Sequence, residues 1–295
     1  MLALTSAMWI LPALLGPSYA SLTSSLASWR WALGLLVVPM LLVRFYVARQ
    51  LRELPETERD DSPLQLGSSV ALAASVALVL VASKPTPFRI VVAILGVVGA
   101  LIFARRLMPP GVFSLSRGRA AGIGLLMLLC FVYCGGDDIL PLFVTYGLHG
   151  SVPTAGFALT LGALAWAIAG ILQERAKTPL IIAGRLRFAA VLLFVGFAGL
   201  AVLLASFRSP DVAWLSALFW CLVGLGMGVA YPSLLTFVFD DGQEDGLRTQ
   251  VATGVVLAEA LAGGLGGTVS GAVFSAWTSS PRGCPEVGGT SVAAR

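Results

Sequence analysis

One apolar run, from Ala120 to Leu148, constrains the fold of this chain more than any other segment. The run is long enough to cross a bilayer, because about 20 residues at about 1.5 Å rise span a hydrocarbon core of about 30 Å. Asp137 and Asp138 interrupt it, and Pro141 follows them. A charged residue near the middle of a spanning helix costs roughly 2.5–3.5 kcal/mol, so it usually faces a bundle interior or an aqueous cavity. We therefore predict that this segment is a helix that lines a cavity.

The composition indicates that most of the chain lies in the membrane. Of the 295 residues, 57% are hydrophobic and 12% are charged, whereas soluble domains carry about 25% charged residues. The apolar runs that we interpret as spans are Leu2–Leu26, Ala32–Val47, Leu66–Ala82, Ile90–Ala104, Ala120–Leu148, Pro153–Ile171, Phe188–Phe207, Val212–Phe239 and Val251–Trp277. The sequence therefore predicts an all-α, polytopic membrane protein with nine transmembrane helices.

The sequence contains few residues suited to catalysis or metal binding. The chain has four cysteines and a single histidine, His149, with no Gly-rich phosphate loop, zinc-ligand spacing or Ser/His pair. Gly135-Gly136-Asp137 differs from the G-x-G-D motif of intramembrane aspartyl proteases, because Cys134 stands where that motif has its first glycine. We expect no enzyme activity, no cofactor and no metal. Basic residues are spread over the loops, so we expect no nucleic-acid partner.

Three acidic residues within the apolar runs are the candidates for proton exchange or for lining a substrate cavity. Asp137 and Asp138 are neighbours, so their side chains point about 100° apart around a helix. Glu259 lies in the last run, at a different expected depth from Asp137. The alternatives are that the aspartates are hydrated near the outer interface, and that Glu259 reaches towards the inner interface or bonds to a neighbouring helix.

Two further patterns have both structural and functional interpretations. Gly263, Gly267 and Gly271 have the spacing of a small-residue seam for helix packing. Glu174, Arg175 and Lys177 form a charged cluster at a helix end. That cluster could stabilise one conformation by ion pairing with a neighbouring helix terminus, or it could simply set the topology through its positive charge.

Three stretches carry a resemblance to a known family. They are the run from Gly16-Pro17 through SWRWALGLLVVPMLLVRFYVARQLRELPE, the loop Gly170-Ile171-Leu172-Gln173-Glu174-Arg175, and GLGMGVAYPSLL from Gly224 to Leu235. They resemble, in that order, the fifth and sixth helices, the loop motif G-x-L-x-D-R and the fourth helix of the second half of major facilitator superfamily transporters. Glu174 replaces the Asp of the loop motif. In the antiporter motif g-x-x-x-G-P-x-x-G-G, Gly16 and Pro17 match, and Pro12, Ala20 and Ser21 replace the other glycines.

The resemblance extends to the domain organisation of the fourteen-helix drug:proton antiporters, in which a similar Trp-Arg-Trp follows the fifth helix. It implies that the chain lacks the first four helices of that fold and the last. The implied domains are the last two helices of the N-terminal half (1–50), a cytoplasmic linker (51–65), the extra central helix pair (66–117), five helices of the C-terminal half (118–278) and a polar tail (279–295).

The resemblance also implies a function and the residues that serve it. It implies a secondary active transporter that exports small or amphipathic molecules in exchange for protons. The family has an acid at the position of Asp137, whereas Asp138 and Glu259 are candidates because they are acids within apolar runs. The excess of arginine over lysine indicates a bacterial source, so we expect the bacterial plasma membrane. The loop motif implies a role for Gly170, Glu174, Arg175 and Lys177. The partners are then a small-molecule substrate, protons and lipid. The alternative is a truncated, non-transporting membrane remnant with at most a protein-association role.

Overall fold

The described part of the chain is helical throughout. The computed structural model describes residues 28–51, 66–82, 88–108, 111–115, 118–175, 182–207, 209–239 and 245–278, together with Gly16, Tyr19 and Thr23 as single positions. Among these residues there is no β-strand. The chain divides into two compact units, Met1–Leu64 and Gln65–Arg295. The first unit and the second are described separately below.

The first unit contributes helices α2 (Trp29–Gly34) and α3 (Val37–Leu51). A turn at Leu35 and Leu36 separates them. Pro39 accounts for the break, because it has no N–H to donate to the Leu35 carbonyl oxygen. That oxygen instead accepts from the Val38 nitrogen at 3.3 Å. The expected span Ala32–Val47 is therefore two helices.

A helical hairpin, α4 (Leu66–Ala82) and α5 (Arg89–Leu107), begins the second unit. The helices approach closely because α5 carries glycines where it meets α4. A Cβ built on Gly96 would lie 2.9 Å from the Ser75 carbonyl oxygen, so a larger residue would separate the two backbones.

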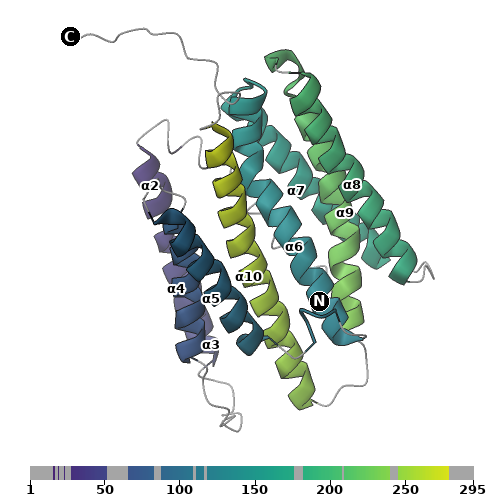
Figure 1. Ribbon diagram of the computed structural model, residues 1–295. Helices are drawn as coiled ribbons and strands as arrows, with labels where there is room; N and C mark the ends of the chain where they lie inside the picture. Colours follow the sequence, from purple (N-terminus) through teal and green to yellow (C-terminus); the bar gives the residue numbers. More distant parts are fainter. Residues whose placement is uncertain are drawn as a thin grey trace. The chain divides into compact units, whose positions relative to one another are not determined.

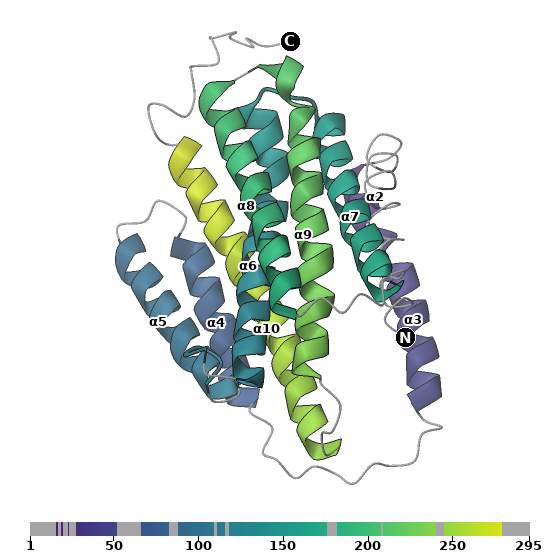
Figure 2. The ribbon, with the colours of Figure 1, turned by 90° about the vertical axis from the view of Figure 1, so that its right-hand side faces the viewer.

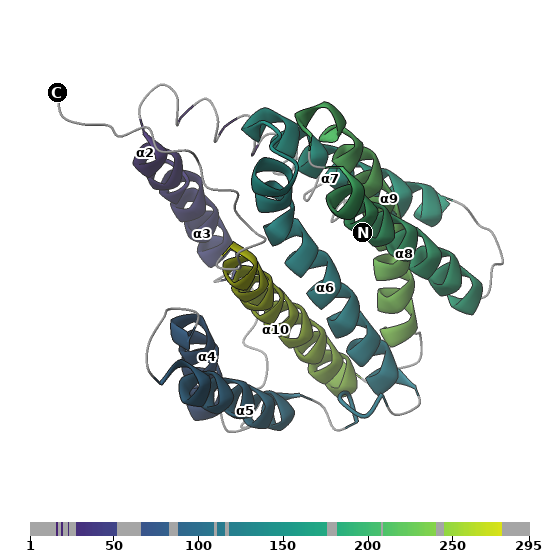
Figure 3. The ribbon, with the colours of Figure 1, turned by 45° about the horizontal axis from the view of Figure 1, so that its top comes forward.

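The main bundle consists of five long helices. They are α6 (Arg119–Leu142), α7 (Val152–Arg175), α8 (Ile182–Ser206), α9 (Leu215–Val238) and α10 (Asp245–Thr278). A π-helical turn, η1 (Phe143–Gly147), extends α6, and a 3-10 turn, η2 (Pro210–Val212), precedes α9. Helix α9 packs on α7, α8 and α6 (Figures 1 and 2), and α10 packs on the other side of α6 (Figure 3) and contacts α4.

Small residues bring the helices of the bundle together. The Gly162 carbonyl of α7 occupies the place that a Cβ on Gly224 of α9 would need. Trp220, which is fully buried, packs over Gly162 from α9. Close backbone approach of this kind is the usual basis of helix association in a bilayer, where apolar contact alone gives no preference for a neighbouring helix over lipid.

Among the residues that the structure describes, six helical segments are long and apolar enough to cross a membrane. They are Ile90–Leu107, Arg119–Gly147, Val152–Gln173, Ile182–Ser206, Pro210–Val238 and Val251–Ser275. The prediction of an all-α, polytopic membrane protein is confirmed, and the number of spans stays a prediction. Of the other three expected spans, Leu66–Ala82 is a single helix of 17 residues, which is about 25 Å long. Leu2–Leu26 lies outside the described residues apart from three single positions.

Candidate functional site

Asp137 and Asp138 lie together on α6 but have different surroundings. Asp137 is half-buried and Asp138 is exposed. The Asp138 carboxylate lies against α10, where a Cβ built on Gly267 would be 2.5 Å from its Oδ2 atom. The structure therefore brings together two residues singled out in the sequence, with the missing side chain of Gly267 leaving room for the carboxylate.

The backbone of α6 is irregular beside the two aspartates. Pro141 has no N–H, so the carbonyl oxygen of Asp137 lacks its usual helical donor. The Thr145 hydroxyl donates to the Pro141 carbonyl oxygen at 2.7 Å, and the π-helical turn η1 follows at once. Single π turns within helices are frequent at functional positions.

Glu259 is half-buried on α10 and bonds to a tyrosine of α9. The Tyr231 hydroxyl donates a hydrogen bond to Glu259 Oε1 at 2.6 Å. A bond to a neighbouring helix was one of the two structural alternatives considered for Glu259 from the sequence. Tyr231 was not among the predicted site residues. A tyrosine followed by proline in a spanning helix was the available signal, because a buried tyrosine hydroxyl usually needs a partner.

Five aromatic rings pack in succession across α6, α7, α8 and α9. We call these residues the aromatic array: Phe197, Trp220, Tyr133, Trp166 and Tyr231. The centroid separations between successive rings in that order are 5.9, 5.6, 5.2 and 5.9 Å. Tyr133 lies one helical turn before Asp137, and Tyr231 bonds to Glu259, so the aromatic array links the surroundings of the two acids across four helices.

A small groove lies on the opposite side of α6 from Asp137. The groove has a volume of about 230 Å³ and runs between α6, α8 and α10. It is lined by Phe131, Val132, Gly135, Gly136, Ile139, Phe197, Gly266, Val269 and Ser270. Gly135 and Asp137 are two residues apart, or about 200° around the helix. The groove is thus separate from Asp137, and it is smaller than the roughly 300–1,000 Å³ typical of ligand pockets.

The loop-motif residues lie at the end of α7. Gly170 is buried in the helix, Glu174 and Arg175 belong to its last turn, and Lys177 lies outside the described residues. Gln173, within the same stretch, donates from Nε2 to the Ser233 hydroxyl of α9 at 2.6 Å. This bond ties the end of α7 to α9, and the sequence did not predict it.

The three glycines proposed as a seam on α10 meet different neighbours. A Cβ on Gly263 would be 4.0 Å from Cys134 Sγ, Gly267 faces Asp138, and Gly271 has no neighbour within 4 Å of that position. Among the glycines of α10, the closest approach to another backbone is made by Gly266, which meets Gly135 of α6. Of the antiporter-motif residues, Gly16 is half-buried. Pro17 lies outside the described residues.

The chemistry available at these positions is proton exchange and hydrogen bonding. Within the described ranges, no group of three or more His, Cys, Asp or Glu side chains could hold a metal ion. Asp137 and Glu259 are partly buried in helices of spanning length, where ionisable groups usually mark an ion or substrate path.

Comparison with known proteins gives one consistent similarity. No protein-family profile matches the chain. Two proteins, each named "probable multidrug-efflux transporter" and from two strains of Mycobacterium tuberculosis, are 29% identical to it over 254 residues. The similarity covers 81% of this chain and 53% of each relative. The chain thus spans about half the length of these relatives, and over most of its own length it is similar to proteins named as multidrug-efflux transporters.

Proposed function

We propose that this protein is a secondary active transporter that exports small, amphipathic molecules in exchange for protons. The observation that carries the proposal is the pair of partly buried acids, Asp137 and Glu259, on two packed helices of spanning length. The similarity to proteins named as multidrug-efflux transporters supports the transport role. The resemblance to the drug:proton antiporters of the major facilitator superfamily supports the coupling to protons.

Asp137 is the preferred proton carrier. A coupling group must gain and lose a proton as its surroundings open to one side of the membrane and then to the other. Asp137 is half-buried next to the irregular turn at Pro141, whereas Asp138 is exposed. A partly dehydrated carboxyl group responds most strongly to a change in hydration, because burial disfavours its charged form.

In this proposal the end of α7 stabilises one conformation. Glu174, Arg175 and Lys177 form the charged cluster of the loop motif, and their charges can pair with a neighbouring helix end on the cytoplasmic side. The Gln173–Ser233 hydrogen bond supports this assignment, because it already joins the end of α7 to α9.

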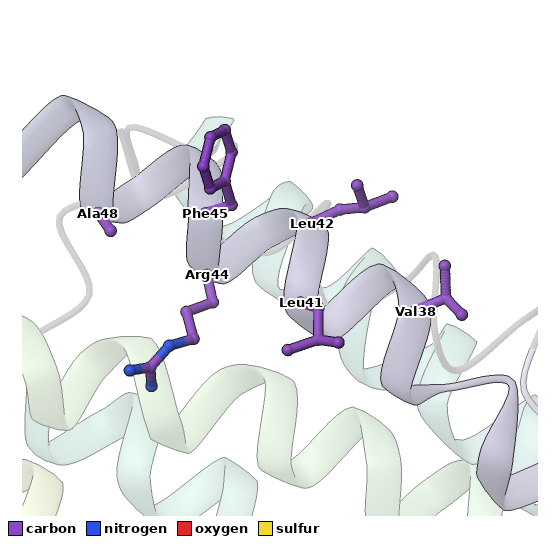
Figure 4. A pocket seen from close by; sticks show the side chains of 6 residues that line it. All are labelled: Val38, Leu41, Leu42, Arg44, Phe45 and Ala48. Carbon is purple, nitrogen blue, oxygen red and sulfur yellow. The ribbon is translucent and has the colours of Figure 1, made fainter.

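One observation favours the second candidate, an association role in the membrane without transport. Within its own unit, no neighbouring element buries the described side chains of α3. Figure 4 shows Leu41 and Arg44 projecting to one side of this helix and Leu42 and Phe45 to another. An apolar helix of this kind could pack against another membrane protein.

Ethidium accumulation by proteoliposomes with an imposed pH gradient tests the proposal. The wild-type chain should accumulate ethidium. Asp137→Asn should permit downhill movement and lose gradient-driven accumulation, because Asn keeps the size and removes the titrating group. Asp138→Asn should have a smaller effect, and Asp211→Asn, in the exposed turn η2, is the matched control. Undiminished gradient-driven accumulation by Asp137→Asn would exclude Asp137 from the proton path. No accumulation by the wild-type chain would favour the association role.

A further inference from the structure

We propose that Tyr231 is the positioning residue for Glu259. In this proposal the hydrogen bond between them holds α9 and α10 together while Glu259 is ionised and weakens when Glu259 takes up a proton. The inference rests on the proposed function, because it assigns a regulatory contact to one of the candidate proton-coupling acids.

The geometry fits an ionised acceptor. The separation of 2.6 Å between Tyr231 Oη and Glu259 Oε1 falls within the 2.5–2.7 Å typical of a hydroxyl donating to a carboxylate. Charge-assisted bonds of this kind are roughly twice as strong as neutral ones. Protonation of Glu259 therefore weakens the contact without any change in the residues that make it.

Ring packing fixes the position of the tyrosine hydroxyl. The Tyr231 ring meets the Trp166 ring edge to face, at 5.9 Å and 74°, and the Trp166 ring meets that of Tyr133 at 5.2 Å and 65°. Such aromatic pairs add about 0.5–1.5 kcal/mol each beyond the area they bury. The Tyr231 ring is therefore held against Trp166 of α7, and the flexible Glu259 side chain is the part that can move.

The contact matters because α9 and α10 share little other packing. Helix α9 packs on α6, α7 and α8, whereas α10 packs mainly on α6 and touches α4. The Tyr231–Glu259 bond joins the two helices directly. Losing it would allow α10 to move with α6 relative to α9, which is the kind of displacement that opens a cavity between helices.

The titratable groups around Glu259 are few. From α6, the thiols of Cys130 and Cys134 interact electrostatically with Glu259, and from α9 Tyr231 does so. Asp137 and Asp138 lie further along α6, at and just beyond the next turn after Cys134. Helix α4 carries no titratable side chain, and along α10 itself Asp245 and Arg248 precede Glu259 by about four and three turns. Tyr231 donates to Glu259 through a phenolic hydroxyl, and Tyr231→Phe removes that hydroxyl without introducing a charged side chain.

Infrared difference spectroscopy of the purified full chain in lipid, recorded as a function of pH, tests the inference without requiring transport. The carboxyl band that disappears in Glu259→Gln reports the protonation of Glu259. In Tyr231→Phe, which keeps the ring and removes the hydroxyl, the frequency of that band should shift, because the Glu259 carboxyl group has lost a hydrogen-bond donor. Tyr146→Phe, at an exposed tyrosine whose ring packs on Phe274, should leave the frequency unchanged.

Transport assays with the same variants separate a positioning role from a structural one. If Tyr231 acts through Glu259, the double variant Tyr231→Phe/Glu259→Gln should transport like Glu259→Gln alone, because the interaction is already lost. An unchanged band frequency in Tyr231→Phe, or the absence of a carboxyl band that Glu259→Gln removes, would overturn the inference. If the wild-type chain shows no gradient-driven transport, the proposed function is overturned. The infrared measurement would still test the Tyr231–Glu259 contact, because it does not depend on transport.

Discussion

Gly135 of α6 and Gly266 of α10 meet backbone to backbone. A Cβ built on Gly266 would lie 3.0 Å from the Gly135 nitrogen and 2.8 Å from the Phe131 carbonyl oxygen. One turn further along α10, the Ser270 hydroxyl donates to the Gly135 carbonyl oxygen at 2.6 Å. This crossing sets the distance between the two helices that carry all three candidate acids.

Substitution of Gly266 should therefore destabilise the bundle. In Gly266→Ala the new methyl group meets backbone atoms that cannot move alone, so we expect a loss of about 1–3 kcal/mol, as for other overpacked sites. The measurement is thermal unfolding of the purified protein in detergent. The control is Gly264→Ala, where an added Cβ meets nothing within 4 Å. That variant should be neutral or slightly more stable, given the better helix propensity of alanine.

The next glycine should behave differently from Gly266. An alanine at Gly267 meets the Asp138 carboxylate, which is the flexible end of an exposed side chain. We expect Gly267→Ala to change the unfolding free energy by less than about 0.5 kcal/mol, because the carboxylate can turn aside. Equal destabilisation by Gly266→Ala and Gly267→Ala would show that the backbone contact between Gly266 and Gly135 does not limit how closely α6 and α10 approach.

Pro141 should lower the stability of the protein and increase the mobility of α6. Pro141→Ala restores a donor to the Asp137 carbonyl oxygen and makes the helix regular, so we expect a gain of about 1–3 kcal/mol in detergent unfolding. Transport should slow at the same time, because the irregular turn next to Asp137 is removed. Pro153→Ala is the control, because Pro153 occupies the first turn of α7, where a missing N–H breaks no helical bond. Faster transport by Pro141→Ala would contradict a functional role for this turn.

The Gln173–Ser233 pair offers a test of the α7–α9 contact. The Ser233 hydroxyl accepts from Gln173 and donates to the Val229 carbonyl oxygen at 2.8 Å. Ser233→Ala leaves the buried amide unpaired and should cost about 1–3 kcal/mol. The double variant Ser233→Ala/Gln173→Leu should recover most of that loss, because the Gln173 amide is then absent and cannot be left without a hydrogen-bond partner. Thr236→Val, at an exposed hydroxyl, should be nearly neutral. A double variant no more stable than Ser233→Ala would argue against this contact.

The sequence was sufficient for the helical architecture because length and polarity determine which segments can cross a bilayer. The run Ala120–Leu148 corresponds to α6 and η1, from Arg119 to Gly147. The break between α2 and α3 was missed, although Pro39 was visible, because a proline within an apolar run does not by itself show where a helix ends. Helix α10 begins at Asp245, six residues before the expected span Val251–Trp277, because a helix can continue beyond the apolar run that marks a span.

The acids were visible in the sequence, but their partners were not. A carboxyl group in an apolar run is conspicuous, which is why Asp137, Asp138 and Glu259 were identified. Tyr231 reads as one more apolar side chain, and its contact with Glu259 joins residues 28 positions apart on different helices. Which aromatic residue reaches which acid depends on the helix crossings. Those crossings are set by glycines at Gly135, Gly162 and Gly266, and no local pattern in the sequence predicts which of them pair.

Proton movement driven by substrate tests the central claim most directly. Proteoliposomes containing the full chain and a trapped pH-sensitive dye receive tetraphenylphosphonium on the outside, with no pH gradient imposed. Obligatory exchange predicts a change in internal pH that scales with the amount of protein and is abolished by Asp137→Asn. The same pH trace in wild-type, Asp137→Asn and protein-free liposomes would contradict proton-coupled transport by this chain.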